Sequence, residues 1–186
     1  MNNLTTLKRA ALGLMLAAGF FLTGCAVPKL ADYAAEKPVL DMRQYFSGTV
    51  DAYGVFTNRS GKVLKRFTVV MKCSWVGPPG QEVGTLDEDF TNSDGTKERR
   101  VWTLKRSPDG KYVGTASDVI GVALGEEAGN TFRWSYTLML PLDGKTLEVQ
   151  FDDWMYLMSD KVMLNRAEMS KFGIKLGEVT LSFVKR

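Results

Sequence analysis

Acidic side chains and one arginine carry most of the chemistry that this chain could perform, because the chain contains no histidine. Without imidazole, the commonest general base, proton shuttle and nitrogen metal ligand are all missing. Three charged residues, Glu88, Arg100 and Asp153, fall on the apolar parity of segments that alternate between apolar and polar side chains. Burying such groups is costly unless they are paired. These three residues are therefore the first candidates for a binding site.

Catalytic and metal-binding patterns are otherwise missing. Cys73 has no histidine to activate it as a nucleophile. Asp152 and Asp153 are adjacent on a predicted strand and point to opposite faces, so their spacing does not favour a metal site. We expect Asp118 to cap a turn. No phosphate-binding glycine loop, nucleophile elbow or zinc spacing occurs. We therefore predict no catalytic residue, no metal, no cofactor and a protein that is not an enzyme.

Composition fits one folded domain. The chain has 186 residues, of which 45% are hydrophobic and 24% charged, as in ordinary globular proteins. The 24 basic and 21 acidic residues give a net charge of +3, which is too small to indicate a nucleic-acid partner.

Strand and turn signals predict an all-β fold from Tyr45 onward. Asp-Gly pairs at 94–95, 109–110 and 143–144 favour tight turns. The segments between turns are rich in Val, Thr and aromatic residues and alternate with period two. A sandwich and a closed up-and-down barrel both fit, and sequential hairpins favour the antiparallel barrel, with about eight to ten strands. A barrel of that size can enclose one small ligand.

The apolar parity of each strand predicts which side chains point inward. The candidate pocket residues so identified are Trp75, Glu88, Arg100, Trp102, Trp134, Tyr136 and Asp153. Two interpretations stay open. In the first, the charges are structural: Glu88 or Asp153 pairs with Arg100 inside the barrel, or a bulge turns these charges outward. In the second, Arg100 binds the anionic head group of a ligand, while the aromatic rings line an acyl or ring-shaped pocket.

The first residues are typical of an export signal. Lys8 and Arg9 precede an uncharged run from Ala10 to Leu22, which is shorter than the roughly 20 residues of a membrane-spanning helix. The run ends in Leu22-Thr23-Gly24-Cys25 and resembles the lipobox of bacterial lipoproteins. The resemblance implies a signal peptide at 1–24, lipid on Cys25, a tether at 25–44 and a barrel domain at 45–186. Ala26 after the cysteine implies the periplasmic face of the outer membrane.

Most of the remaining chain resembles a family of uncharacterised proteobacterial lipoproteins. The segments that carry the resemblance are 93–102, 116–121 and 152–166. The resemblance implies a lipocalin-like barrel and, because genes of this family often neighbour those of lipid-modifying enzymes, a role in envelope lipid metabolism or stress.

We therefore expect a membrane-anchored, lipocalin-like protein that carries or senses a small hydrophobic or acyl-lipid ligand. One alternative is an envelope scaffold with a filled barrel and an exposed aromatic patch around Trp154 and Tyr156. A less favoured one is a hydrolase or isomerase that uses Asp118 or Asp153.

Overall fold

The computed structural model describes residues 27–142 and 145–186. The expected signal peptide, Cys25 and the Asp143-Gly144 turn lie outside them. The described chain forms a 3-10 helix η1 (Leu30–Tyr33), a short helix α2 (Met42–Tyr45) and ten strands, namely β1 (Gly48–Asn58), β2 (Val63–Val76), β3 (Val83–Asn92), β4 (Lys97–Arg106), β5 (Tyr112–Thr115), β6 (Val119–Ala128), β7 (Thr131–Leu142), β8 (Lys145–Leu157), β9 (Val162–Lys171) and β10 (Ile174–Lys185). Neither described helix is long and apolar enough to cross a membrane.

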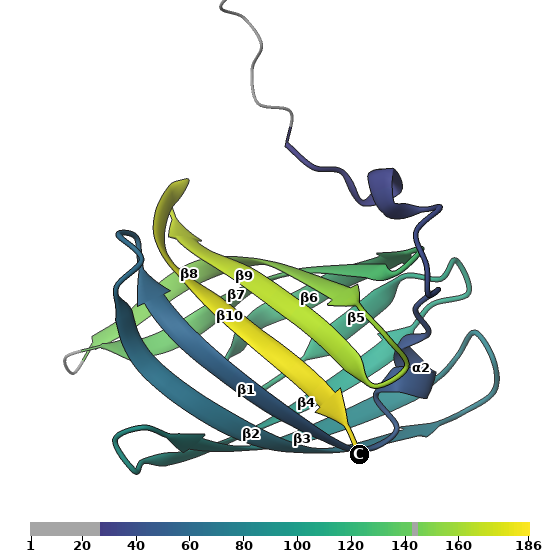
Figure 1. Ribbon diagram of the computed structural model, residues 1–186, viewed down its shortest axis with the longest axis horizontal. Helices are drawn as coiled ribbons and strands as arrows, with labels where there is room; N and C mark the ends of the chain where they lie inside the picture. The colour runs from purple at the N-terminus through teal and green to yellow at the C-terminus, as the bar shows by residue number, and fades with distance from the viewer. Residues whose placement is uncertain (1–26, 143–144) are drawn as a thin grey trace, which may run out of the picture.

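The strands form one closed antiparallel barrel in which each strand pairs with its neighbours in sequence (Figure 1). The barrel closes where β1 pairs with β10, with Ala52 opposite Phe183. Tight turns join the strands, and Gly95 and Gly110 of the expected Asp-Gly pairs have the positive φ that these turns need. The predicted all-β up-and-down barrel is confirmed.

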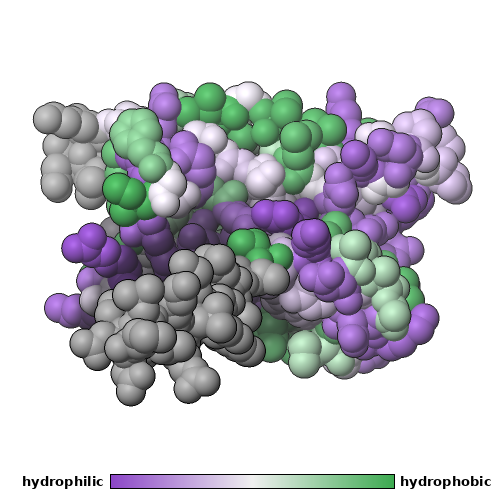
Figure 2. All heavy atoms as spheres, turned by 90° about the horizontal axis from the view of Figure 1, so that it is seen from above, coloured by the Kyte–Doolittle hydropathy of each residue, from purple (hydrophilic) through white to green (hydrophobic). Residues whose placement is uncertain are grey.

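Alternation along the strands separates the core from the outer surface. The inward parity expected for β2, β3 and β4 is confirmed. Met71, Leu86 and Trp102 are buried, whereas Lys72 and Val101, which are the sequence neighbours of Met71 and Trp102, are exposed. The upper outer face mixes polar and apolar side chains rather than grouping them (Figure 2). The buried apolar side chains form a single cluster that lines the inside of the barrel wall.

One end of the barrel is closed by the chain that precedes β1. Phe46, only 1% exposed, packs edge-on against Phe183, and its carbonyl oxygen accepts a 2.7 Å hydrogen bond from the indole of Trp75. Leu40 and Met42 are also buried in the barrel core. In the segment for which we expected a tether, residues from Leu40 onward thus pack into the barrel, because their apolar side chains cover its open end.

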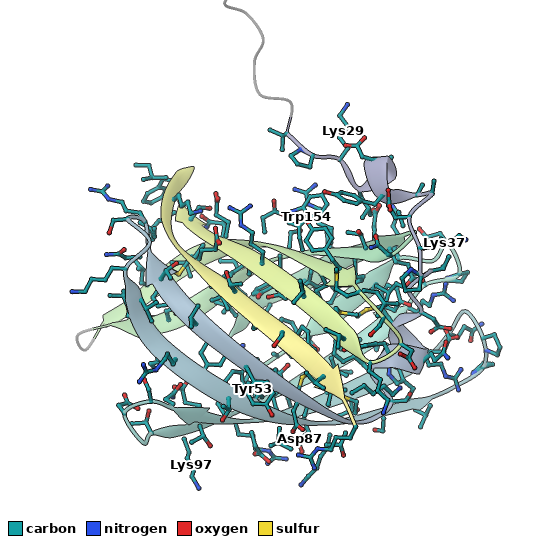
Figure 3. All side chains as sticks on the ribbon, in the orientation of Figure 1. Lys29, Lys37, Tyr53, Asp87, Lys97 and Trp154 are labelled. Carbon is teal, nitrogen blue, oxygen red and sulfur yellow. The ribbon has the colours of Figure 1, made fainter. Side chains whose placement is uncertain are left out.

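The segment before α2 lies along the outside of the barrel at the same end (Figure 1). Tyr33 of η1 packs on Trp154 and Tyr156 of β8, with ring centroids 5.8 and 5.6 Å apart. Figure 3 shows Trp154 below this N-terminal segment. Gly129 leaves no room for a side chain, because a Cβ there would lie 1.9 Å from the carbonyl oxygen of Tyr33. The aromatic patch expected at Trp154 and Tyr156 is thus partly covered.

Candidate ligand-binding cavity

A cavity of about 620 Å³ occupies the inside of the barrel. Met42 and Phe46 border it on the side of the closed end. Residues from eight of the ten strands line its wall, and the aromatic ones among them are Phe56, Phe67, Phe90, Trp102, Phe132, Trp134, Tyr136, Phe151 and Phe183. Its volume lies in the range of sites for small molecules, about 300–1,000 Å³. The interior is therefore not solidly packed.

Tryptophans form much of the wall because small residues beside them leave space. Gly114 of β5 and Gly125 of β6 flank the indole of Trp134, and a Cβ at either position would lie within 2.5 Å of it. Trp134 in turn packs edge-on against Trp102, at 5.6 Å between ring centroids. Tyr136 meets the other side of Trp102 at 5.4 Å. These rings give the cavity a rigid apolar wall.

Arg100 of β4 is paired inside the barrel with Asp118, in the turn between β5 and β6. Its Nε and Nη2 atoms donate to the same carboxylate oxygen, Oδ2, at 2.9 and 2.6 Å. The guanidinium also lies over the ring of Phe90, 5.7 Å from its centroid. The other oxygen of Asp118, Oδ1, is buried without a partner in the described structure.

This pair answers the open question about Arg100. Arg100 points inward and has an acidic partner, but that partner is neither Glu88 nor Asp153. Asp118 reaches Arg100 because the chain bends between β5 and β6 and a bulge follows between Ile120 and Leu124. The turn-capping role expected for Asp118 is therefore wrong, because its carboxylate holds Arg100 instead.

Asp153 of β8 lies at the centre of a second polar group. It is only 6% exposed, and it accepts a hydrogen bond from the hydroxyl of Tyr136 at 3.3 Å and another from the amide of Asn165 on β9. Burial raises the pKa of Asp153 to about 7, although both hydrogen bonds act in the opposite direction. Burial also raises the pKa of Tyr136, so the phenol stays protonated and donates.

Glu88 of β3 lines the same cavity and lies opposite Arg100 in the strand register. Among the described residues it forms neither a hydrogen bond nor an ion pair. Part of its side chain is accessible, and because Glu88 lines the cavity we assign that accessibility to the cavity rather than to bulk solvent. Its pKa is raised to about 7, first by loss of hydration and then by the charges of Asp118 and Asp153, while Arg100 lowers it.

The structure thus brings six of the predicted pocket residues to one cavity, namely Glu88, Arg100, Trp102, Trp134, Tyr136 and Asp153. Trp75 does not line it, because its indole is held at the closed end by Phe46 and packs against Tyr112. Sequence reasoning considered Asp118 only as a turn cap or a less favoured catalytic carboxylate and did not place it in the pocket. It missed Asn165, which lies on a strand whose inward parity it did not assign. Neither position carries a signal beyond its place in the fold.

Cys73 is a buried free thiol. Burial and the charge of Glu88 raise its pKa to about 12, so the thiol stays protonated and unreactive near neutrality. In residues 27–142 and 145–186 no group of three or more acidic or cysteine side chains is arranged to hold a metal ion.

A closed antiparallel barrel with an interior cavity is a lipocalin-like fold. The chain belongs to the family described as "Protein of unknown function (DUF3833)", whose model matches residues 19–185. None of the curated proteins matches the sequence.

Among solved structures, the barrel is similar to the S-type phycobiliprotein lyase CPES from Guillardia theta. The TM-score is 0.60 over 86% of this chain and 98% of the lyase chain, with 9% sequence identity. Because the sequence identity is so low, this similarity shows that the two chains share a fold and nothing about their functions.

The prediction that this protein is not an enzyme has to be corrected. The similar barrel belongs to a protein named as a lyase, so this fold does not imply a role without catalysis. The absence of histidine removes one set of mechanisms. The carboxyl groups of Glu88 and Asp153, whose pKa values are raised to about 7, are nevertheless suited to acid–base work.

Proposed function

We propose that this protein binds a small hydrophobic ligand of the acyl-lipid kind inside its barrel. The observation that carries the proposal is the cavity of about 620 Å³ with its largely aromatic and aliphatic wall. Burial of an acyl chain against such a wall contributes roughly 0.8 kcal/mol for each methylene group. The few polar groups, Glu88, Arg100, Tyr136 and Asp153, would then orient one end of the ligand.

The same cavity argues against the filled-barrel scaffold. A scaffold needs no interior space, and empty volume in a core lowers stability. The aromatic patch that the scaffold hypothesis requires is partly covered by Tyr33.

Binding can be tested with N-phenyl-1-naphthylamine, an uncharged dye that fluoresces in apolar surroundings. We expect the full chain to bind the dye and to release it when dodecanol is added. Ala167, which is 2% exposed and lines the cavity, is the position at which to fill it. Ala167→Phe should weaken dye binding by roughly tenfold or more. Native mass spectrometry of the purified protein should also find a lipid that copurifies.

Ala35→Phe is the matched control, since it makes the same change at an exposed position outside the barrel. It should leave dye binding unchanged. Ala167→Leu, a smaller change, keeps the test valid if the phenylalanine variant fails to fold. Equal binding by the folded cavity-filled variants and the control would overturn the proposal.

We further propose that the protein acts at the periplasmic face of the outer membrane, anchored by lipid on Cys25. The support is the order of basic residues, apolar run and Leu22-Thr23-Gly24-Cys25 in the sequence. Because stable anchoring needs more than one acyl chain, an unlipidated protein should leave the membrane. Cys25→Ser should therefore move the protein from the outer-membrane fraction to the soluble fraction, and retention of this variant in the membrane would contradict the anchor.

A further inference from the structure

The charges around the cavity are not balanced. Two cationic side chains line the cavity, Arg100 and Lys65. The Lys65 side chain is 41% exposed and pairs with Glu98 at 3.4 Å, whereas that of Arg100 is 25% exposed. Three carboxyl groups belong to this part of the barrel, because Glu88 and Asp153 line the cavity with Arg100, and Asp118 holds the Arg100 guanidinium. When all of them are ionised, this cluster therefore carries a surplus of negative charge.

Arg100 is already occupied. Both of its donating nitrogens lie on Oδ2 of Asp118, and Oδ1 of Asp118 has no partner in the described chain. An anionic head group that took Arg100 would leave the partly exposed Asp118 without its donor, and Oδ1 of that carboxylate is already buried and unpaired in the described structure. The ligand would replace one arginine–carboxylate pair by another and leave Asp118 unpaired, so the exchange brings little net gain. The guanidinium therefore does not favour a fatty-acid anion.

The cavity contains a carboxyl group that lacks a hydrogen-bond donor. Glu88 has no hydrogen-bond partner in the described chain, and its accessible part faces the space that a ligand would fill. Asp153 accepts from Tyr136 and Asn165, one donor on each oxygen. A carboxylate has about four acceptor positions, so Asp153 retains further acceptor capacity, whereas a buried acceptor without any donor is costly.

We infer, on the basis of the proposed binding function, that the cavity selects amphiphiles whose head group is cationic and donates hydrogen bonds, such as a long-chain amine, over fatty-acid anions. The ammonium group would lie beside Glu88 and within reach of Asp153, while its chain packs against Trp102 and Trp134. Its positive charge offsets the surplus of carboxylates, and its three N–H groups supply the donors that Glu88 lacks.

The test compares dodecylammonium with dodecanoate, which share a chain and differ in head-group charge. Each displaces N-phenyl-1-naphthylamine from the full chain below its micelle concentration, at about pH 8, where both head groups and the cavity carboxylates are charged. We expect dodecylammonium to bind at least tenfold more tightly, which corresponds to about 1.4 kcal/mol. Glu88→Gln should remove most of this difference, mainly by weakening the amine.

Asp89→Asn is the matched control. Asp89 is the next residue on β3, faces outward and is exposed, so its substitution changes the net charge equally without touching the cavity. It should preserve the preference for the amine. Equal affinities for the two ligands, tighter binding of dodecanoate, or loss of the preference in Asp89→Asn as well would overturn the inference. If none of the probes binds at all, the proposed binding function fails with it, so the two failures are distinguishable.

Discussion

Of the arginine–carboxylate pairs in the described chain, those of Arg100 and Arg106 on β4 have different surroundings. Arg106 pairs with Glu127 at 3.3 Å and lies over the ring of Tyr112, 5.8 Å from its centroid. Arg100 pairs with Asp118 at 2.6 Å and lies over the ring of Phe90 at almost the same distance, 5.7 Å. Both pairs join a carboxylate to an arginine of β4 that lies over an aromatic ring, although the contact is shorter at Arg100.

The difference is what lies beside each pair. At the closed end, buried rings such as Phe46 and Tyr112 fill the interior, and Arg106 does not border the cavity. Arg100 borders about 620 Å³ of space together with the unpartnered Glu88. The same kind of ion pair can therefore belong to a packed end of the barrel or to a binding site. Which of the two it belongs to depends on whether side chains fill the space beside it.

We expect the largest loss of stability from a substitution at the closed end of the barrel. Phe46→Ala should lower the free energy of unfolding by about 3–5 kcal/mol, because it removes a fully buried ring and leaves a void. Urea denaturation measures the change. Phe172→Ala, at a side chain 88% exposed, should stay within about 0.5 kcal/mol of the wild type. Similar losses in the two variants would contradict the description of the closed end as the packed one.

Removing each arginine separates the two pairs. Arg100→Met should cost about 2–3 kcal/mol, because Asp118 is left without any side-chain donor. Arg106→Met should cost less, about 1–2 kcal/mol, because the hydroxyl of Tyr112 lies 3.4 Å from the carboxylate of Glu127 and still donates to it. Adding Asp118→Asn to Arg100→Met should recover part of the loss. A larger cost at Arg106 would reverse the comparison.

The pH dependence of stability sharpens the difference at Glu88. Its pKa rises from 4.5 to about 7 on folding, so the folded protein holds this proton more tightly than the unfolded chain. The contribution of Glu88 to the free energy of unfolding is therefore fully present below about pH 4.5, and it is lost as the pH rises toward 7. Between these values wild type should lose about 1–3 kcal/mol relative to Glu88→Gln, measured by urea denaturation at each pH. Identical pH profiles of the two proteins would exclude a buried, unpaired Glu88.

The smallest effect concerns the segment that covers the outside of the closed end. Tyr33→Ala should lower stability by about 1 kcal/mol, because its ring packs on Trp154 and Tyr156. Thermal unfolding measures the shift. Tyr53→Ala, at an exposed position on β1, should change stability less. No difference between the two variants would show that the segment contributes nothing to the barrel.

The alternation of apolar and polar residues predicted most of the side chains that point into the barrel, because successive side chains of a strand point to opposite faces. It placed Glu88, Arg100 and Asp153 on the inner face, where the structure has them. It could not pair them, because pairing depends on strand register and on the bulge near Gly121, which bring Asp118 to Arg100.

Two further features depend on three-dimensional packing. The closing role of Leu40 and Met42 comes from a segment too short to show a helical repeat. The cavity itself arises from how the rings around Trp134 fit together, with Gly114 and Gly125 giving them space. Residue types do not reveal whether such rings meet and fill a barrel or stand apart and leave a pocket.

The central claim is that the cavity bordered by Arg100 and Glu88 holds a ligand. The most direct measurement is a crystal structure of the protein grown with a dodecylamine that carries a terminal bromine, with the bromine located by anomalous scattering. The account predicts a bromine peak inside the barrel and the amine beside Glu88. A peak only on the outer surface, such as at the exposed Phe172, with the barrel interior empty, would contradict it.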